Sequence, residues 1–231
     1  MTTPKVRKQK HQNNLPKKDK DSKVLTAQNG GIASSKWKYV AAVLSGLTLL
    51  AAAVLKHRVA KRGLAYGGSN GGASILDLHS GALSKNDKFI NVYRRVKDKI
   101  HRAIAEHFHV PLTSLFLTKP TFFSRMNTSE AKTMHDEYWH PHIDRVTYGS
   151  FFYTSLLYLT TYGTDFTGGR FIFTDQGHNM TVEPRLGRVS FFTSGSENVH
   201  YVEKLTSGVR YAVTISFTCD PSMAIADPNV R

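Results

Sequence analysis

The sequence predicts a mainly β domain, built as a barrel or sandwich with one helix lying on it and a membrane-crossing helix ahead of it. After Pro111 the chain is a series of short β-branched and aromatic runs separated by Gly, Asp, Asn and Pro. Many short strands at such spacing are typical of an all-β core. Residues 85–108 carry apolar residues at helical spacing, and residues 39–55 contain no charged residue. A length of 231 residues is enough for one domain with a substantial core.

The basic character of the chain belongs to its N-terminal segment. The formal net charge is +14, from 31 Lys and Arg against 17 Asp and Glu. Residues 1–62 contribute 14 − 2 = +12, and residues 63–231 contribute 17 − 15 = +2. A nucleic-acid-binding domain would carry its basic patch on the fold, so this distribution argues against that class. The single cysteine, Cys219, excludes an intrachain disulfide and a thiolate zinc cluster.

The first 56 residues predict a tail followed by a signal-anchor. Residues 1–36 are polar and Lys-rich, a composition that predicts a disordered, basic cytoplasmic tail. Residues 37–56 are predicted to form a single transmembrane helix, since the 17 uncharged residues of 39–55 span about 25 Å as a helix. A buried soluble helix would show a polar face, and a cleaved signal peptide would have a much shorter polar region ahead of it.

Charge and glycosylation motifs indicate the orientation in the membrane. Ten Lys and Arg precede the span and four follow it closely, which favours a cytoplasmic N-terminus and a type II topology. The sequons at Asn127 and Asn179 fall after the span, as expected for a lumenal domain bearing glycans. The short span suits the thin bilayer of the endoplasmic reticulum, so a secretory-pathway membrane is the expected location.

A linker and a helix are predicted between the span and the β core. Residues 57–84 include the Gly/Ser-rich stretch "RGLAYGGSNGGAS" and are expected to be a flexible linker. The helix over residues 85–108 starts after Ser84, a residue type that caps helices, with Asp87 in its first turn. Its apolar stripe consists of Phe89, Tyr93, Val96, Ile100, Ile104 and Phe108. This stripe should pack on the β core.

The stretch "HPHID", residues 140–144, contains the strongest candidates for metal ligands. His140, His142 and Asp144 occupy every second position, so on a β-strand they would share one face. Two histidines and one carboxylate form the facial triad of non-haem Fe(II) oxygenases, which leaves open positions on the metal. His200, at the start of the later run "HYVEKL", is the candidate for a histidine supplied by another strand. Whether His140 joins the site stays open.

An arginine near the last of these residues predicts an acidic co-substrate. Arg210 lies ten residues after His200, within the apolar run "VRYAVTI". A buried arginine is costly unless an anion pairs with it, and a guanidinium matches a carboxylate with two parallel hydrogen bonds. A metal triad beside such an arginine suits a ligand that chelates the metal at one end and pairs with arginine at the other.

Several longer blocks carry a specific resemblance. They are "HID" at 142–144, "LLYLT" at 156–160, "TGGRFIF" at 167–173, "VEPRLGRVSFFTSGSENVHYV" at 182–202 and "GVRYAVTISF" at 208–217. In these blocks the chain resembles the prolyl 4-hydroxylase branch of the Fe(II)/2-oxoglutarate dioxygenases. The resemblance implies a double-stranded β-helix, or jelly roll, with its core at about 115–219 inside a domain of residues 85–231, buttressed by the helix.

The same resemblance implies a role for each site residue. His142, Asp144 and His200 would bind Fe(II), and Arg210 would pair with the distal carboxylate of 2-oxoglutarate. Arg210 stands where collagen-type members have lysine, which keeps the positive charge. Tyr158 matches a tyrosine whose hydroxyl helps to hold that carboxylate, and Thr214 would line the same pocket.

The implied function is a dioxygenase reaction on a protein side chain. Fe(II), the co-substrate 2-oxoglutarate, O2 and ascorbate would be required, with succinate and CO2 released and a residue such as proline hydroxylated. One alternative is an inactive double-stranded β-helix that serves as a binding module, although such a copy would be expected to have lost a member of the set. Another is a cupin-like metal hydrolase, which would not need Arg210. The sequence does not identify the protein substrate.

Overall fold

The computed structural model describes residues 56, 72–79, 87–133, 136–174 and 179–228. Two helices, α2 and α3, span Asp87–His107 and Asp144–Tyr148, and short 3₁₀ turns lie at Leu112–Ser114, Ser196–Asn198 and Pro221–Met223. The strands are β1 Ala73–Asp77, β2 Phe116–Met126, β3 Tyr153–Tyr158, β4 Phe166–Gly168, β5 Phe171–Phe173, β6 Met180–Val182, β7 Val189–Thr193, β8 His200–Val202, β9 Leu205–Gly208 and β10 Arg210–Thr218.

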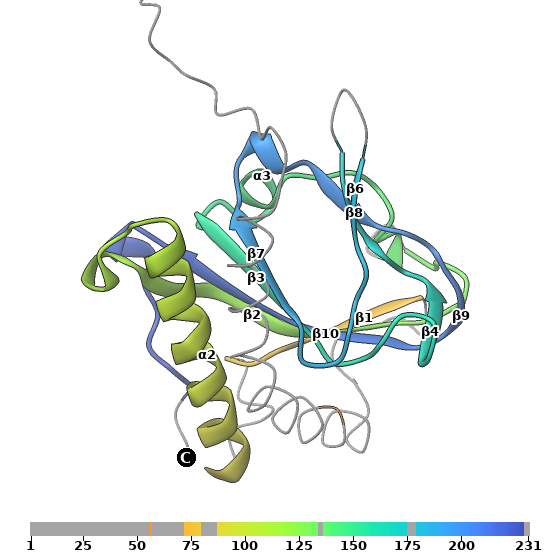
Figure 1. The fold of residues 1–231 in the computed structure, drawn as a ribbon, viewed down its shortest axis with the longest axis horizontal. Helices are drawn as coiled ribbons and strands as arrows, with labels where there is room; N and C mark the ends of the chain where they lie inside the picture. Colours follow the sequence, from red (N-terminus) through yellow and green to blue (C-terminus); the bar gives the residue numbers. More distant parts are fainter. Residues whose placement is uncertain (1–55, 57–71, 80–86, 134–135, 175–178, 229–231) are drawn as a thin grey trace, which may run out of the picture.

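These strands form one larger sheet and two smaller ones. The larger sheet has the order β1-β2-β10-β3-β7, and the smaller sheets are β6-β5-β8 and β4-β9. Every pairing between named strands is antiparallel. In Figure 1 the larger sheet lies between α2 on its outer side and the smaller sheets on its inner side. The prediction of a mainly β fold is confirmed, and the arrangement is consistent with the expected jelly roll.

The central strand β10 separates two cores. Val213, Ile215 and Phe217 belong to the core that the larger sheet shares with α2. Ala212 belongs to a second core, with residues from β3, β5, β7 and β8. Because side chains alternate along a strand, Arg210 lies on the same face as Ala212, toward the interior between the sheets. The interior face of β10 therefore carries the predicted co-substrate residue.

Helix α2 packs on the outer face of the larger sheet, as predicted. Tyr93, Val96, Ile100 and Ile104 are each at most 4 % exposed and belong to the core shared with the sheet. Phe108, just beyond the helix, packs partly buried against the same core. The 3.6-residue repeat of the sequence thus corresponds to the buried face of the helix.

The folded domain begins earlier than the sequence suggested. Strand β1 lies inside residues 57–84, the stretch expected to be a flexible linker, and pairs with β2 from Ala73 to Asp77. Leu76 and Leu78 are buried while Ile75 is 49 % exposed, so this stretch alternates as a half-buried strand does. The linker prediction is wrong for residues 73–77, because the free edge of β2 offers backbone groups that β1 satisfies.

Strand β2 continues through Lys119 and Pro120 and joins the apolar residues on either side of them in one strand. The predicted tail, residues 1–36, and membrane span, residues 37–56, lie outside the described residues except for Lys56. The Lys56 ammonium group forms an ion pair of 2.7 Å with Asp165 of the domain. In the part of the chain that the structure describes, no helix is both long enough and apolar enough to cross a membrane.

The contact between α2 and the sheet predicts a specific stability effect. Ile100 is 0 % exposed, so Ile100→Ala should lower the free energy of unfolding by about 2–5 kcal/mol through lost burial and a cavity. Arg102→Ala, at an exposed position of the same helix, should change it by less than about 0.5 kcal/mol. Urea unfolding followed by circular dichroism measures both. Equal effects of the two substitutions would contradict the packing described for α2.

Candidate metal centre

The "HPHID" stretch does not form the strand that the sequence suggested. His142 makes an isolated antiparallel bridge with His200, with hydrogen bonds of 2.9 Å and 3.1 Å between their backbone N–H and C=O groups. Asp144 is the first residue of α3. The His142 and Asp144 side chains therefore do not lie together because of alternation along a strand. They lie together because His142 forms a bridge with β8 and Asp144 begins α3.

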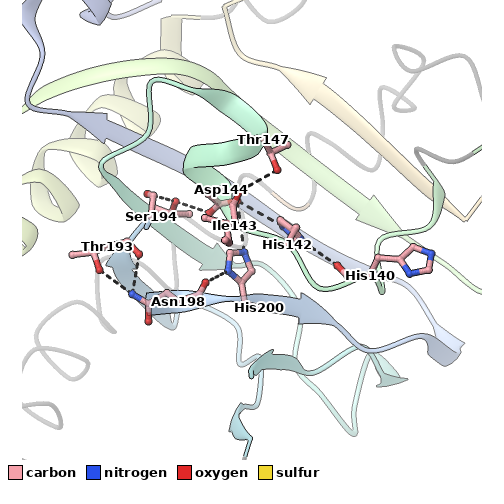
Figure 2. Close-up of polar contacts among 10 residues, drawn as sticks. His140, His142, Ile143, Asp144, Thr147, Thr193, Ser194, Asn198 and His200 are labelled. Atoms are coloured by element: carbon pink, nitrogen blue, oxygen red, sulfur yellow. Dashed lines mark hydrogen bonds and ion pairs between the residues drawn. The ribbon is translucent and has the colours of Figure 1, made fainter. Parts of the chain in front are cut away.

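The structure brings His142, Asp144 and His200 together, as predicted (Figure 2). Asp144 Oδ1 lies 3.7 Å from His142 Nε2 and 3.6 Å from His200 Nε2. One ligand atom from each residue lies within 4.8 Å of the other two, close enough for one ion to contact all three. The side chains of Asp144 and His200 are 6 % and 4 % exposed, whereas His142 is 38 % exposed, so the centre is reached from the His142 side.

Hydrogen bonds hold both histidine rings in the orientation that a metal requires. Nδ1 of His142 donates to the His140 carbonyl at 3.0 Å, and Nδ1 of His200 donates to the Asn198 carbonyl at 2.8 Å. A carbonyl only accepts, so the proton sits on Nδ1 and the Nε2 lone pair faces the centre. Metal-binding histidines usually donate their second ring nitrogen in this way.

The electrostatic surroundings favour the metal-binding protonation states. Burial alone would raise the pKa of Asp144, but the neighbouring His200 ring, the Thr154 hydroxyl and His142 together hold it below its ordinary value. Burial lowers the pKa of His142, although its hydrogen bond to the His140 carbonyl works in the opposite direction. An ionised carboxylate and a neutral imidazole are the forms that bind metal.

His140 lies apart from the other three side chains. Its Nε2 is 2.7 Å from Glu137 Oε2, and its side chain is 62 % exposed. Figure 2 shows its ring directed away from His142 and Asp144. The structure therefore leaves His140 out of the candidate metal site, which answers the question that the sequence left open.

Arg210 is buried, and no carboxylate of the described residues pairs with it. It is 1 % exposed, its guanidinium carbon lies 5.5 Å from the centre of the Tyr158 ring, and its Nη1 donates to the Met126 sulfur at 3.6 Å. Its Nε and Nη2 have no hydrogen-bond partner among the described residues. Burial lowers the pKa of Arg210. A buried charge without a partner is destabilising, so the site fits a carboxylate ligand such as that of 2-oxoglutarate.

Tyr158 and Thr214 line the same interior as Arg210. The Tyr158 hydroxyl lies 3.0 Å from Ser190 Oγ, and burial raises the pKa of Tyr158, so the hydroxyl keeps its proton and can donate it to a carboxylate. Thr214 is 6 % exposed and pairs with Leu156 on β3. The structure places both residues on the side of Arg210, and their roles toward a co-substrate stay predictions.

Several residues that support the ligands were not identified from the sequence. The Thr154 hydroxyl donates to Asp144 Oδ2 at 2.6 Å, and the side-chain amide of Asn198 donates to the Thr193 carbonyl at 2.9 Å. Three rings surround His200, with centroid distances of 4.9 Å, 6.1 Å and 5.0 Å for Phe171, Phe173 and Phe192. The only signal in the sequence was the strand-like run that contains Thr154, ten residues after Asp144.

The two predicted glycosylation sites have different surroundings. Asn179 is exposed, directly ahead of β6. Asn127 is partly buried, and its side-chain oxygen accepts a hydrogen bond of 3.0 Å from the Ser129 backbone. Asn179 is therefore the more accessible acceptor of the two, and modification of either stays a prediction.

Curated relatives share most of this chain. A protein of Xenopus tropicalis named 2-oxoglutarate and iron-dependent oxygenase domain-containing protein 3 is 60 % identical over 206 residues, which cover 81 % of this chain and 65 % of that protein. The Homo sapiens protein of the same name is 58 % identical over 189 residues, covering 74 % and 59 %. Homo sapiens prolyl 3-hydroxylase 2 is 43 % identical over 72 residues, covering 30 % and 10 %. The chain thus spans less than two thirds of the length of the relatives it matches over most of its residues.

Solved structures confirm the fold. A prolyl 4-hydroxylase from Pseudomonas putida superimposes with a TM-score of 0.53 at 16 % identity, covering 78 % of this chain and 98 % of that one. A prolyl hydroxylase from Trichoplax adhaerens, solved with a hypoxia inducible factor peptide fragment, gives a TM-score of 0.52 at 15 % identity, covering 76 % and 78 %. At such identities the likeness concerns the fold alone.

The geometry of the triad predicts unequal effects for two neighbouring substitutions. Asp144→Ala should abolish Fe(II) binding, because only two neutral imidazoles remain as ligands. His140→Ala should leave most of the binding intact, since His140 lies outside the triad. Anaerobic calorimetric titration with Fe(II) measures both variants. A greater loss in His140→Ala than in Asp144→Ala would show that the ligands within "HPHID" are wrongly assigned.

The model of the 2OG-Fe(II) oxygenase superfamily matches residues 124–218. The matched range contains all three members of the triad, as well as Arg210 and Tyr158. This family implies Fe(II), 2-oxoglutarate and O2, and the side chains present fit them, with the triad as a potential iron site and Arg210 as a buried cation without a partner. The family model, the highly similar relatives and the fold agree: residues 124–218 of this chain form a domain of the 2OG-Fe(II) oxygenase superfamily.

Proposed function

We propose that this protein is a membrane-anchored, Fe(II)- and 2-oxoglutarate-dependent dioxygenase that hydroxylates a protein side chain. The observation that carries the proposal is the Arg210 guanidinium, which is buried on the interior face of β10 and has two nitrogens without a hydrogen-bond partner among the described residues. A bare metal site or a binding module would not require a buried guanidinium, which destabilises the fold unless an anion pairs with it. A dicarboxylate that also reaches the metal would supply that anion.

The interior faces of β3 and β10 connect the two ends of the proposed site. Asp144 is hydrogen-bonded to Thr154, at one end of β3. Tyr158 lies four residues further along β3, about 13 Å at ~3.3 Å per residue. The long Arg210 side chain lies over the Tyr158 ring. A co-substrate lying along this face would have the triad at one end and Arg210 with Tyr158 at the other, while Thr214 lines the wall between them.

The protein's own contribution is to bind, orient and exclude water. Fe(II) with 2-oxoglutarate and O2 supplies the oxidising chemistry, and ascorbate would maintain the metal in its reduced state. The triad would hold the metal from one side only. The three phenylalanine rings beside His200 keep that side dry, which strengthens charge interactions within the site. The side chain to be hydroxylated would approach past His142, the exposed member of the triad.

A prolyl side chain in a protein is the proposed target. Support comes from the similarity to prolyl 3-hydroxylase 2 and from the shared fold with solved prolyl hydroxylases. A protein substrate also suits the geometry, since a long chain can lie outside the barrel and offer one side chain to the exposed side of the triad. The uncharged residues 39–55 and the basic residues ahead of them support a type II anchor in the secretory pathway, with the domain in the lumen.

Substitution of Arg210 tests the proposed function. Arg210→Ala should spare Fe(II) binding and weaken 2-oxoglutarate binding, because the distal carboxylate would lose its partner in a dry site. Loss of one member of a buried pair costs roughly 3–5 kcal/mol, which is on the order of a hundred-fold or more in Kd. Calorimetry under nitrogen, with metal already bound, gives the Kd. Succinate formation under air then gives the apparent constant for the co-substrate.

Three further substitutions make this test specific. Arg210→Lys should do less harm, since it keeps the charge but loses the two-pronged geometry. Arg210→Met removes the charge without leaving a large cavity, so it should impair 2-oxoglutarate binding without lowering the stability of the metal-free protein. Arg170→Ala, which removes an arginine paired with Glu203 at the surface, is the matched control and should leave the Kd for 2-oxoglutarate unchanged. If wild-type protein binds Fe(II) but not 2-oxoglutarate, it is a binding module and not an oxygenase.

The proposed topology makes a separate prediction. The anchor should hold residues 57–231 inside sealed microsomes, where protease cannot reach them. Endoglycosidase should increase gel mobility, and Asn179→Gln should remove more of that shift than Asn127→Gln, because Asn179 is the exposed sequon. Full digestion of the domain in sealed microsomes, with no glycan detected, would reverse the proposed orientation.

A further inference from the structure

Two buried hydroxyl groups lie behind the carboxylate of Asp144. Thr154 Oγ1 is 2.6 Å from Asp144 Oδ2, and Ser194 Oγ is 2.8 Å from Thr154 Oγ1. Thr154 and Ser194 are 2 % and 1 % exposed. Thr154 lies in β3, and Ser194 directly follows β7, the neighbouring strand of the larger sheet. The other carboxylate oxygen, Oδ1, is the one that faces the two histidine rings. The carboxylate therefore has one oxygen toward the metal position and one toward the hydroxyls.

The direction of these hydrogen bonds follows from the number of protons available. An ionised carboxylate only accepts, so the single hydroxyl proton of Thr154 is committed to Asp144 Oδ2. Ser194 must then donate to Thr154 Oγ1. A hydroxyl that accepts one hydrogen bond becomes a stronger donor in the next, so Ser194 strengthens the contact that Thr154 makes with Asp144.

The backbone fixes the position of this pair relative to Asp144. The backbone N–H of Ser194 donates to the Phe152 carbonyl, and the Ser194 carbonyl accepts from the backbone N–H of Arg145, both at 2.9 Å. Arg145 directly follows Asp144 in α3. Ser194 therefore holds the start of α3 through its backbone and supports the Asp144 side chain through Thr154.

We propose that Thr154 and Ser194 are positioning residues that keep Asp144 as a ligand through one oxygen only. The inference rests on the proposed function, in which the triad binds Fe(II). A carboxylate can bind a metal through one oxygen or both. If Oδ2 were released to the metal, it would occupy a coordination position that the open face of the triad keeps for 2-oxoglutarate and O2. The Thr154 hydroxyl prevents this by holding Oδ2 away.

The test measures metal binding and stability in parallel. Thr154→Val replaces the hydroxyl by a methyl group of similar size, and it should weaken Mn(II) binding by about 10- to 100-fold, as loss of a partner behind a metal ligand does. The visible absorption of the Co(II) protein should also change, because it reports the number of ligands. Thr154→Ser, which keeps the hydroxyl, should restore both properties, and Ser194→Ala should cause a smaller loss in the same direction.

Ser155→Ala is the matched control. Ser155 is the next residue on β3, is fully buried, and donates its hydroxyl to the Ile215 carbonyl at 2.6 Å. Its loss should reduce stability in urea while Mn(II) affinity and the Co(II) spectrum stay at wild-type values. Wild-type Mn(II) affinity and an unchanged Co(II) spectrum in Thr154→Val would overturn the positioning role and leave the proposed function standing. Absence of Mn(II) and Fe(II) binding in wild-type protein would overturn both.

Discussion

The pairing of β10 with β2 on one side and β3 on the other is the constraint on which the rest of this domain depends. It fixes which residues of β10 face α2 and which face the interior, because a slip of one residue would exchange the two faces. In the observed register Val213, Ile215 and Phe217 lie in the core shared with the helix, and Arg210 lies toward the interior. Packing of the core shared with α2 therefore places the charged Arg210 side chain in the interior between the sheets.

That interior charge lowers the stability of the fold unless an anion pairs with it. Most buried polar groups in proteins are hydrogen-bonded, yet two nitrogens of Arg210 have no partner among the described residues. Stability alone does not account for this arrangement, since an apolar side chain of similar volume would suit the same position. A ligand that pairs with Arg210 and binds only the folded state would offset this loss of stability. A buried charge that the protein itself leaves unpaired is expected at functional sites.

The sequence could predict those features that depend on local pattern. The helix over 85–108 followed from spacing, and the β class followed from short runs and turn residues. The three ligands and Arg210 followed from motif spacing and from the family resemblance. Strand β1 was missed because its pairing with β2 is a contact between distant parts of the chain, and the Gly/Ser-rich stretch ahead of it indicates a linker. The strand predicted for "HPHID" was also wrong, because alternation in the sequence does not distinguish a strand from a single bridge followed by a helix.

The supporting residues could not be predicted for a related reason. Thr154 and Ser194 are 40 residues apart, and nothing in their surroundings marks either as different from other hydroxyls in strands. They meet because β3 pairs with β7, and they reach Asp144 because α3 begins beside the ends of both strands.

The candidate metal centre lies between the larger sheet and the three-stranded sheet β6-β5-β8. Asp144 is supported by Thr154 of β3 and by Ser194, which directly follows β7, both in the larger-sheet region, whereas His200 is the first residue of β8 in the three-stranded sheet. The stretch from Ser194 to Asn198 joins them, since Ser194 supports Asp144 and the Asn198 carbonyl accepts from His200. A metal bound by both side chains would link the two sheets at this point. Its binding energy would therefore act on the relative position of these two sheets, and hence on the interior that contains Arg210.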